Sequence, residues 1–287
     1  MLDSIQEILD RCRAEDVPFW RVVRASDMEQ RQVTAEASRE KMRQTWLAML
    51  ESEESYQARR RSLSGLAGGD GGKMRDFAAQ GHSLSGDYLS EVIAAALCVG
   101  EGNACMRKIV AAPTAGACGV LPAVLLPCAR HFSLSREQLV QALYVASGFG
   151  MVIAARASIS GAEGGCQAEV GSASGMAAAA LVHVMGGEAQ QMAHACAMAL
   201  SNVLGLVCDP VAGLVEVPCV KRNVMGAVNA LSCAEMALAG ITSVIPCDEV
   251  IDAMRAVGEA LPAALRETGA GGLAATPTGH RIAGQQG

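Results

Sequence analysis

The sequence predicts an all-α fold in which irregular, glycine-rich loops carry the functional site. No stretch alternates apolar and polar residues with the period of two that a half-buried strand requires. Periodicity of 3.6 residues and continuous runs of small apolar residues dominate instead. Hydrophobic residues make up 51% of the 287 residues, but aromatic residues only 3%. The core must therefore be built from Ala, Val, Leu, Met and Gly, which favours tightly packed helices.

Charge divides the chain into two parts. Residues 1–62 hold 23 of the 52 charged residues, which predicts a solvated N-terminal segment ahead of a buried body of residues 63–287. Apolar residues recur at helical spacing within this segment. They predict one long amphipathic helix from about 27 to 60, capped by Asp27, with its apolar face on the body or on a partner chain.

Further helices are expected in the body. The apolar patterns predict them at 86–111, 136–156, 172–207 and 223–246, and Pro113 and two glycines predict a turn that opens another helix. Two charge-poor runs, around 170–187 and 189–207, have the length of membrane spans. Their Ala, Gly, Ser, Gln and His content favours buried helices of a soluble protein, so no membrane partner is expected.

Composition also indicates the surroundings of the protein. The net charge is −6 with no basic tract, which argues against nucleic acid as a partner. The N-terminus is charged and lacks the apolar region of a signal peptide. Eleven cysteines, an odd number, favour a reducing cytoplasm over a disulfide framework.

Three cysteines lie in turns rather than in apolar runs. Cys166 follows two glycines, Cys208 precedes Asp-Pro, and Cys219 follows a proline. Glycine and proline form the turns from which a sulfur can project toward a metal. A site with three protein ligands keeps one position open for water or substrate. The spacings of 42 and 11 residues are not typical of a known metal motif, so spacing alone leaves scattered buried thiols as an equal alternative.

Two loops have the character of anion sites. The loop SLSGLAGGDGGKM (62–74) is either a flexible linker or a nest of N–H groups for a carboxylate, assisted by the hydroxyls of Ser62 and Ser64. Its candidate binding positions also include Gly65, Gly68 and Gly69. The turn at 113–119 precedes a helix whose free N–H groups attract anions, which makes Thr114 and Gly116 further candidates.

Five motifs carry a resemblance to a known family. They are SLSGLAGGDGGKM (62–74), APTAGACGVLPAVL (112–125), SISGAEGGCQAEVG (158–171), CDPVAGLVEVPCVKRN (208–223) and GGLAATPTGHRI (271–282). In this order they resemble the α chain, the catalytic half, of the bacterial iron–sulfur L-serine dehydratases. The resemblance runs from about residue 30 to the C-terminus.

The resemblance implies a fold, a cofactor and a reaction. The implied fold is a helical bundle around a buried central helix. Cys166, Cys208 and Cys219 are expected to hold a [4Fe–4S] cluster whose fourth iron acts as a Lewis acid on the hydroxyl of L-serine, giving pyruvate and ammonia. The loop 62–69 and the Thr114 turn are expected to hold the serine carboxylate. A separate β chain and an oligomer are implied, and the C-terminal stretch is expected near the active site.

Several roles stay open at the level of sequence. His82 and Lys73 are the candidates for the base that removes the α-proton, although a β chain could supply it. Ser160 and Gly161, just before Cys166, are candidates for substrate binding. Glu163 and Glu169 either orient neighbouring groups or hold the substrate ammonium. A cation among residues 221–223 would offset the charge of the thiolates.

Four other interpretations compete with this one. The same scaffold could act on L-cysteine or L-threonine. A pyridoxal-phosphate dehydratase needs a Schiff-base lysine, and the chain has only Lys41, Lys73, Lys108 and Lys221. A structural or electron-transfer cluster needs a fourth ligand, such as Cys118 or Cys196. The last alternative is a small membrane protein.

Overall fold

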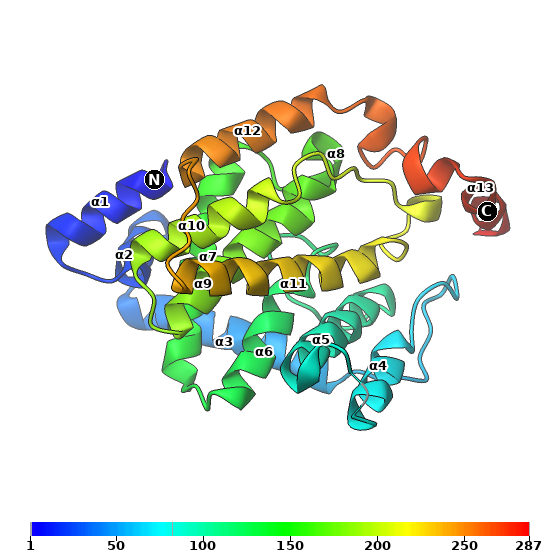
Figure 1. Ribbon diagram of the computed structural model, residues 1–287, viewed down its shortest axis with the longest axis horizontal. Helices are drawn as coiled ribbons and strands as arrows, with labels where there is room; N and C mark the ends of the chain where they lie inside the picture. The colour runs from blue at the N-terminus through cyan, green and yellow to red at the C-terminus, as the bar shows by residue number, and fades with distance from the viewer. Residues whose placement is uncertain (1, 82, 287) are drawn as a thin grey trace.

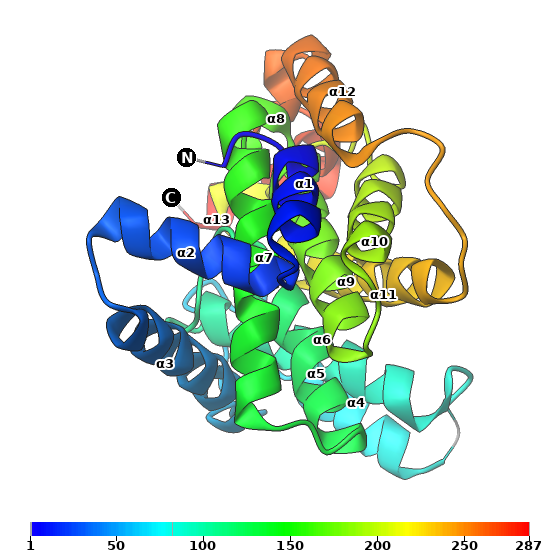
Figure 2. The same cartoon turned by 90° about the vertical axis from the view of Figure 1, so that its left-hand side faces the viewer.

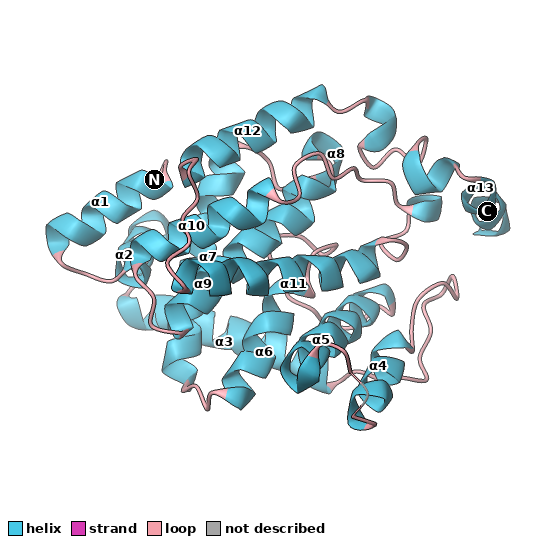
Figure 3. Cartoon of the chain, in the orientation of Figure 1, coloured by secondary structure: helices cyan, strands magenta, loops and turns pink. Residues whose placement is uncertain are grey.

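The computed structural model describes residues 2–81 and 83–286 of the chain. Within these ranges it consists of helices and loops, without a β-strand, which confirms the all-α prediction (Figures 1 and 3). The helices are α1 (Ile5–Glu15), α2 (Phe19–Arg31), α3 (Ala35–Glu54), α4 (Asp70–Ala79), α5 (Gly86–Ala104), α6 (Val120–His131), α7 (Arg136–Arg156), α8 (Gly161–Gly164), α9 (Ser172–Val184), α10 (Ala189–Ser201), α11 (Cys219–Leu238), α12 (Cys247–Ala260) and α13 (Pro277–Gln286). A π-helical turn, Gln167–Gly171, leads into α9.

Helix α9 is the central helix of the bundle. Every residue of α9 except His183 is buried, and helices α6, α7, α10 and α11 pack around it (Figure 1). The contacts depend on small residues. A Cβ added at Gly175 would lie 2.8 Å from Sγ of Cys196 on α10, and one added at Gly226 of α11 would lie 2.7 Å from Val170. The aromatic-poor composition thus corresponds to helices in very close contact.

The N-terminal segment forms three helices, so the prediction of one helix from 27 to 60 is wrong. The chain turns at Gln32, which has a φ of 52°, and Thr34 rather than Asp27 caps α3 through its side chain. Phe19 and Trp46 are buried in the same core as the rest of the chain. The apolar faces of α1 to α3 therefore lie on the body (Figure 2). The division of the chain near residue 62, which was based on its charge content, stays a prediction.

Other predicted elements differ mainly at their ends. Helix α7 has the predicted bounds, but the expected helix over 172–207 is divided into α9 and α10 by a turn at Gly186, which has a φ of 82°. The expected helix over 223–246 begins earlier and ends at Leu238, and α5 ends at Ala104. Helix α12 was not predicted, and the C-terminal stretch contains α13.

Within the described residues, α7 is long and apolar enough to cross a membrane by length and composition. A buried helix of a soluble protein has the same features, so this is weak evidence. Here α7 packs against α2, α3 and α9, and 61% of its apolar stretch is buried inside the protein.

Candidate active site

The three predicted cysteines lie on different elements around one region. Cys166 directly precedes the π-helical turn, Cys208 lies in the loop between α10 and α11, and Cys219 is the first residue of α11. Their exposed fractions are 2%, 3% and 9%. The loop that carries Cys208 and the loop before α4 lie at the end of the molecule that also carries α13 (Figure 1).

Electrostatic interactions show that the three thiols are neighbours. Burial raises the pKa of Cys166 to about 11 and that of Cys219 to about 12. Burial raises the pKa of Cys208 as well, and the nearby charges of Cys166 and Cys219 raise it further. The guanidinium of Arg222 lies beside Cys166 and opposes the increase in its pKa. A cation after Cys219 was expected from the sequence, and Arg222 occupies that place.

The donor set of this region is three cysteines beside one guanidinium. In the described ranges, no three His, Cys, Asp or Glu groups lie close enough together to hold one metal ion. An iron–sulfur cluster takes one cysteine per iron, so its ligands stand farther apart than the ligands of a single ion. A Cβ added at Gly161 would lie 2.8 Å from Sγ of Cys208, so only glycine lets the backbone approach this sulfur so closely. Three buried cysteines and one offsetting guanidinium are residues that could hold an iron–sulfur cluster.

Arg222 is fixed by Asp209, which also binds the C-terminal segment. Nη1 and Nη2 of Arg222 donate to the Val207 carbonyl and to Oδ1 of Asp209, each at 2.7 Å. Oδ2 of Asp209 accepts from the Leu273 N–H at 2.7 Å. The Cys208 N–H donates to the carbonyl of Leu265 at 2.9 Å. The C-terminal segment therefore forms one wall of the cysteine region.

Glu169 lies where several of the candidate binding residues meet. A Cβ added at Gly161 would lie 2.9 Å from Oε2 of Glu169, and one added at Gly116 would lie 3.4 Å from each carboxylate oxygen. Burial raises the pKa of Glu169, and the nearby hydroxyl of Thr114 opposes this increase. The buried Oγ1 of Thr114 completes no hydrogen bond of ordinary geometry. Gly116, Gly161 and Thr114 therefore surround one carboxylate next to the cysteines.

Glu163, the second acid near Cys166, has different surroundings. It is exposed, and its carboxylate accepts a hydrogen bond from the hydroxyl of Ser158 at 2.6 Å. Ser160 lies in the same turn, where its N–H donates to Ser158 Oγ at 3.0 Å and its carbonyl accepts from Gly164 at 2.9 Å. These contacts shape the turn before Cys166, and substrate binding by Ser160 stays a prediction.

The glycine-rich loop before α4 is connected to the cysteine loop through its serines. The hydroxyls of Ser62 and Ser64 donate to Oε2 of Glu216 at 2.7 and 2.6 Å. Glu216 lies between Cys208 and Cys219 in the chain. Gly65 and Gly69 have φ values of 78° and 85°, a region in which an L side chain is strained. The loop is thus an ordered part of the site, not a free linker.

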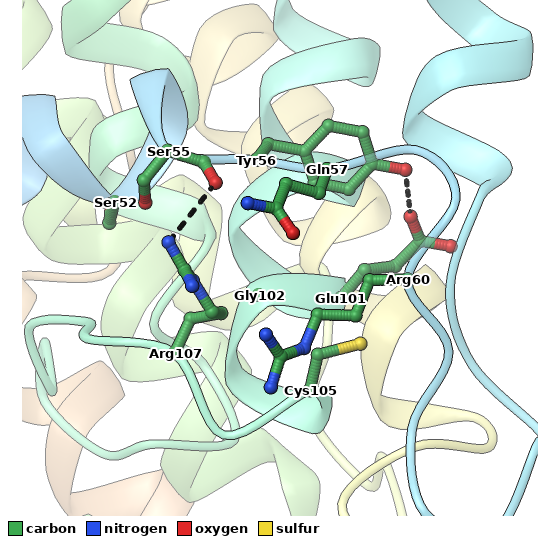
Figure 4. A pocket seen from close by; sticks show the side chains of 9 residues that line it. All are labelled: Ser52, Ser55, Tyr56, Gln57, Arg60, Glu101, Gly102, Cys105 and Arg107. Atoms are coloured by element: carbon green, nitrogen blue, oxygen red, sulfur yellow. Dashed lines mark hydrogen bonds between the residues drawn. The ribbon is translucent and has the colours of Figure 1, made fainter.

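Some of the amides in this loop bind an internal carboxylate. The N–H groups of Gly68, Asp70 and Gly71 donate to the carboxylate of Glu101 at 3.2, 2.8 and 3.1 Å. Tyr56 donates its hydroxyl to the same group at 2.6 Å (Figure 4). The pocket in Figure 4 has a volume of only about 10 Å³, room for about one water molecule. The N–H of Gly68 is therefore already bound to Glu101. The hydroxyls of Ser62 and Ser64 instead contact the loop between Cys208 and Cys219, through Glu216.

Asn223 is an important residue of the site whose role sequence reasoning missed. Its Nδ2 donates to the carbonyls of Gly116 and Cys219 at 2.8 and 2.9 Å, and its Oδ1 accepts from the Gly119 N–H at 2.8 Å. This buried amide thus joins the turn after Thr114 to the start of α11. No local signal could reveal it, because its partner Gly116 is 107 positions away.

The structure does not test the prediction that Lys73 or His82 is the base that removes the α-proton. Lys73 is 75% exposed and donates to Asp70 at 2.8 Å, and Lys221 binds the same carboxylate at 3.2 Å. Its role as a base stays a prediction. His82 lies outside the described residues.

Comparisons with known proteins show the family to which the chain is similar. Residues 14–274 match the family described as "Serine dehydratase alpha chain". The chain is 49% identical over 282 residues to the "Probable L-serine dehydratase, alpha chain" of Bacillus subtilis (strain 168), which covers 98% of this chain and 94% of that relative. It is 41% identical over 284 residues to the "L-serine dehydratase, alpha chain" of Peptoniphilus asaccharolyticus, covering 98% and 97% of the two chains.

A third relative is longer than this chain. Identity to the "L-serine dehydratase" of Mycobacterium tuberculosis (strain CDC 1551 / Oshkosh) is 46% over 184 residues, which cover 62% of this chain but only 40% of that relative. The extent of the family match and these identities lead to one conclusion: the chain belongs to the serine dehydratase α-chain family.

Proposed function

We propose that this chain is the catalytic α chain of an L-serine dehydratase, which converts L-serine into pyruvate and ammonia together with a separate β chain. The observation that carries the proposal is the convergence of three buried cysteines with Glu169, Gly116 and Gly161 in a chain of this family. The names of the relatives supply the substrate and the expectation of a second chain. We also propose an oligomer in a reducing cytoplasm, consistent with eleven free cysteines.

Cys166, Cys208 and Cys219 would hold a [4Fe–4S] cluster. When bound, a cluster with three protein ligands supplies one open iron, a Lewis acid that assists the departure of the serine hydroxyl. The protein residues do the rest. Arg222 offsets negative charge beside Cys166, and Asn223 fixes the start of α11 against the 116 turn. Gly161 lets the backbone pack closely against the sulfur of Cys208.

The proposed substrate-binding groups lie on the loops that adjoin these cysteines. The carboxylate of serine would be bound by the hydroxyls of Ser62 and Ser64 and by the turn at Thr114. Ser62 is buried, and both hydroxyls already bind a carboxylate, that of Glu216. The α-proton requires a positioned base. Lys73, His82 and a group on the β chain are the candidates for that base.

The structure gives no support to a closed, four-cysteine cluster. Sγ of Cys118 is buried and lies 4.0 Å from the carbonyl oxygen of Val99 on α5. Sγ of Cys196 lies against Gly175 of the central helix, away from the site, and the side chain faces Cys247. Neither residue is placed to be a fourth ligand.

A pyridoxal-phosphate mechanism lacks a suitable lysine. All four lysines of the chain are exposed. Lys73 and Lys221 bind Asp70, and Lys108 binds Glu51 at 2.7 Å. A Schiff-base lysine is normally desolvated in a pocket or placed beside another cation, because its amine must be neutral to react.

The experiment that tests the proposal is anaerobic purification of the chain together with its β chain, followed by iron and sulfide analysis and EPR spectroscopy. Iron and sulfide near four per chain, and a reduced-cluster spectrum that changes when L-serine is added, would support it. Zinc in place of iron, or a cluster spectrum that ignores serine in the complete complex, would contradict it. Parallel turnover measurements with L-serine, L-threonine and L-cysteine identify the preferred substrate.

A further inference from the structure

We infer that Glu169 binds the α-ammonium group of the amino-acid substrate. The inference rests on the proposed function and adds a residue that selects amino acids over hydroxy acids without an amine. Sequence alone left Glu163 and Glu169 as equal candidates, and the structure separates them because only Glu169 faces the cysteines.

The first argument is the position of the carboxylate. Gly116 and Gly161 border Glu169 on two sides, and a Cβ added at Gly161 would lie within 3 Å of both Oε2 of Glu169 and Sγ of Cys208. Gly161 is therefore packed tightly against the carboxylate and against a proposed cluster ligand at once. The carboxylate of Glu169 thus lies next to the position where a cluster would be bound.

The second argument is that Glu169 has no cation of its own. Its carboxylate forms no ion pair with any described residue. Arg222, the cation of the site, is committed to Val207 and Asp209. The buried acids around the site are satisfied internally: Glu216 by two serine hydroxyls, Glu101 by three backbone amides, and Asp209 by Arg222. Glu169 is half-buried and has no such cation, so an ammonium group of the ligand would stabilise its charge.

The third argument is the sign of the surrounding charge. Glu267 lies near Glu169, and neither carboxylate forms an ion pair with a described residue. Two carboxylates without a cation attract an ammonium and disfavour a carboxylate. An amino acid is therefore oriented with its ammonium toward Glu169.

The test compares two ligands that differ in the amine. L-serine and 3-hydroxypropanoate share the carboxylate and the β-hydroxyl, and only serine carries an ammonium. Because the active complex turns over L-serine, the KM of L-serine is measured anaerobically by steady-state kinetics on the complex of the α and β chains. The inhibition constant of 3-hydroxypropanoate is measured in the same assay, with iron content determined for each variant. In the unmodified protein, serine is expected to bind much more tightly than 3-hydroxypropanoate.

The variant Glu169→Gln keeps the shape of the side chain and removes its charge. We expect it to weaken the binding of L-serine by about 30-fold or more, while binding of 3-hydroxypropanoate changes little. Glu163→Gln is the matched control, since that exposed acid should leave both constants unchanged. If Glu169→Gln fails to load iron, the test uses Glu169→Asp instead. Its shorter side chain withdraws the carboxylate, which should lower the preference for L-serine over 3-hydroxypropanoate about 10-fold.

The outcomes separate this inference from the proposed function. An unmodified complex that neither binds nor turns over L-serine would overturn both. An unmodified complex that turns over serine, with an unchanged preference over 3-hydroxypropanoate in both Glu169 variants, would overturn the role of Glu169 alone.

Discussion

Arg222 and Asp209 form the most deeply buried ion pair among the described residues, with Nη2 and Oδ1 2.7 Å apart. Arg222 also lies beside Cys166, and Asp209 also accepts the N–H of Leu273. One pair of side chains thus connects a proposed cluster ligand to the C-terminal segment, which is more than 60 residues farther along the chain.

Replacing Asp209 should destabilise the protein strongly. Asp209→Asn leaves a buried guanidinium without a counter-charge, and removing one partner of such a pair costs about 3 kcal/mol of the free energy of unfolding. Denaturant unfolding of the reduced, metal-free chain measures this. Asp252→Asn is the control, because its pair with Arg156 is more exposed and should contribute less than about 1 kcal/mol. Equal effects of the two substitutions would contradict this account.

Removing the amide of Asn223 should separate the 116 turn from α11. Asn223→Ala leaves the Gly119 N–H and two carbonyls without their partner, which we expect to cost about 3 kcal/mol and to lower the iron content. Asn103→Ala removes a single exposed hydrogen bond, 3.1 Å long, to Ala115 in the same turn. It should cost less than about 1 kcal/mol. Iron analysis and unfolding curves of both variants test the difference.

A side chain at residue 161 should disturb the site without unfolding the protein. The Cβ of Gly161→Ala would meet Sγ of Cys208 at 2.8 Å and Oε2 of Glu169 at 2.9 Å. Displacements of this size can reduce kcat/KM about 100-fold. Gly284→Ala is the control, since nothing lies within 4 Å of its Cβ. Circular dichroism should be native in both variants, and full activity of Gly161→Ala would show that the close packing of residue 161 against Cys208 and Glu169 does not matter for the reaction.

The stability of the metal-free chain should fall at alkaline pH because its thiols are buried. Burial raises the pKa of Cys118 from 9.0 to about 12. The folded state therefore favours the protonated thiol, and this contribution is complete below pH 9 and lost as the pH rises from 9 to 12. At pH 10 this one thiol accounts for a loss of about 1 kcal/mol.

Cys118→Ala removes that dependence. The difference in unfolding free energy between Cys118→Ala and the unmodified chain should shift by about 1 kcal/mol in favour of the variant between pH 7.5 and pH 10. Unfolding under reducing conditions at the two pH values measures it. A difference that does not change with pH would mean that Cys118 is accessible to solvent.

The sequence predicted the parts of the fold that have local signals. Helix α7 has the predicted bounds, and Ser135 and Gln138 form a capping box at its start. The break between α2 and α3 was missed because glutamine is an unusual residue for the left-handed conformation found at Gln32. Helix α12 begins after Pro246 with two acids in its first turn, a start signal that was present and overlooked.

The candidate site was predictable only in part, because its contacts are long-range. Spacing did not distinguish the three cysteines from buried thiols, and the resemblance of the surrounding motifs singled them out. Their proximity follows from the fold. Apart from Cys219, four positions from Asn223, the partners of Glu101, Asn223 and Asp209 lie between 13 and 107 positions away, and a single sequence contains no signal for such pairs. The placement of Glu169 between two glycines is a property of the packed structure.

The backbone contacts between Cys208 and residues 265–267 have a consequence for how a cluster reaches its ligands. Cysteine residues with exposed fractions of 2% to 9% are poorly accessible to an inorganic cluster in the folded protein. Residues 263–273 are mostly exposed and hold to the body through a few bonds, two of them to Cys208 and one to Asp209. Local unfolding of this segment requires less free energy than opening the core around α9. We therefore expect cluster assembly to proceed through transient release of this segment, visible as faster hydrogen exchange at Leu273 than at the amides of α9.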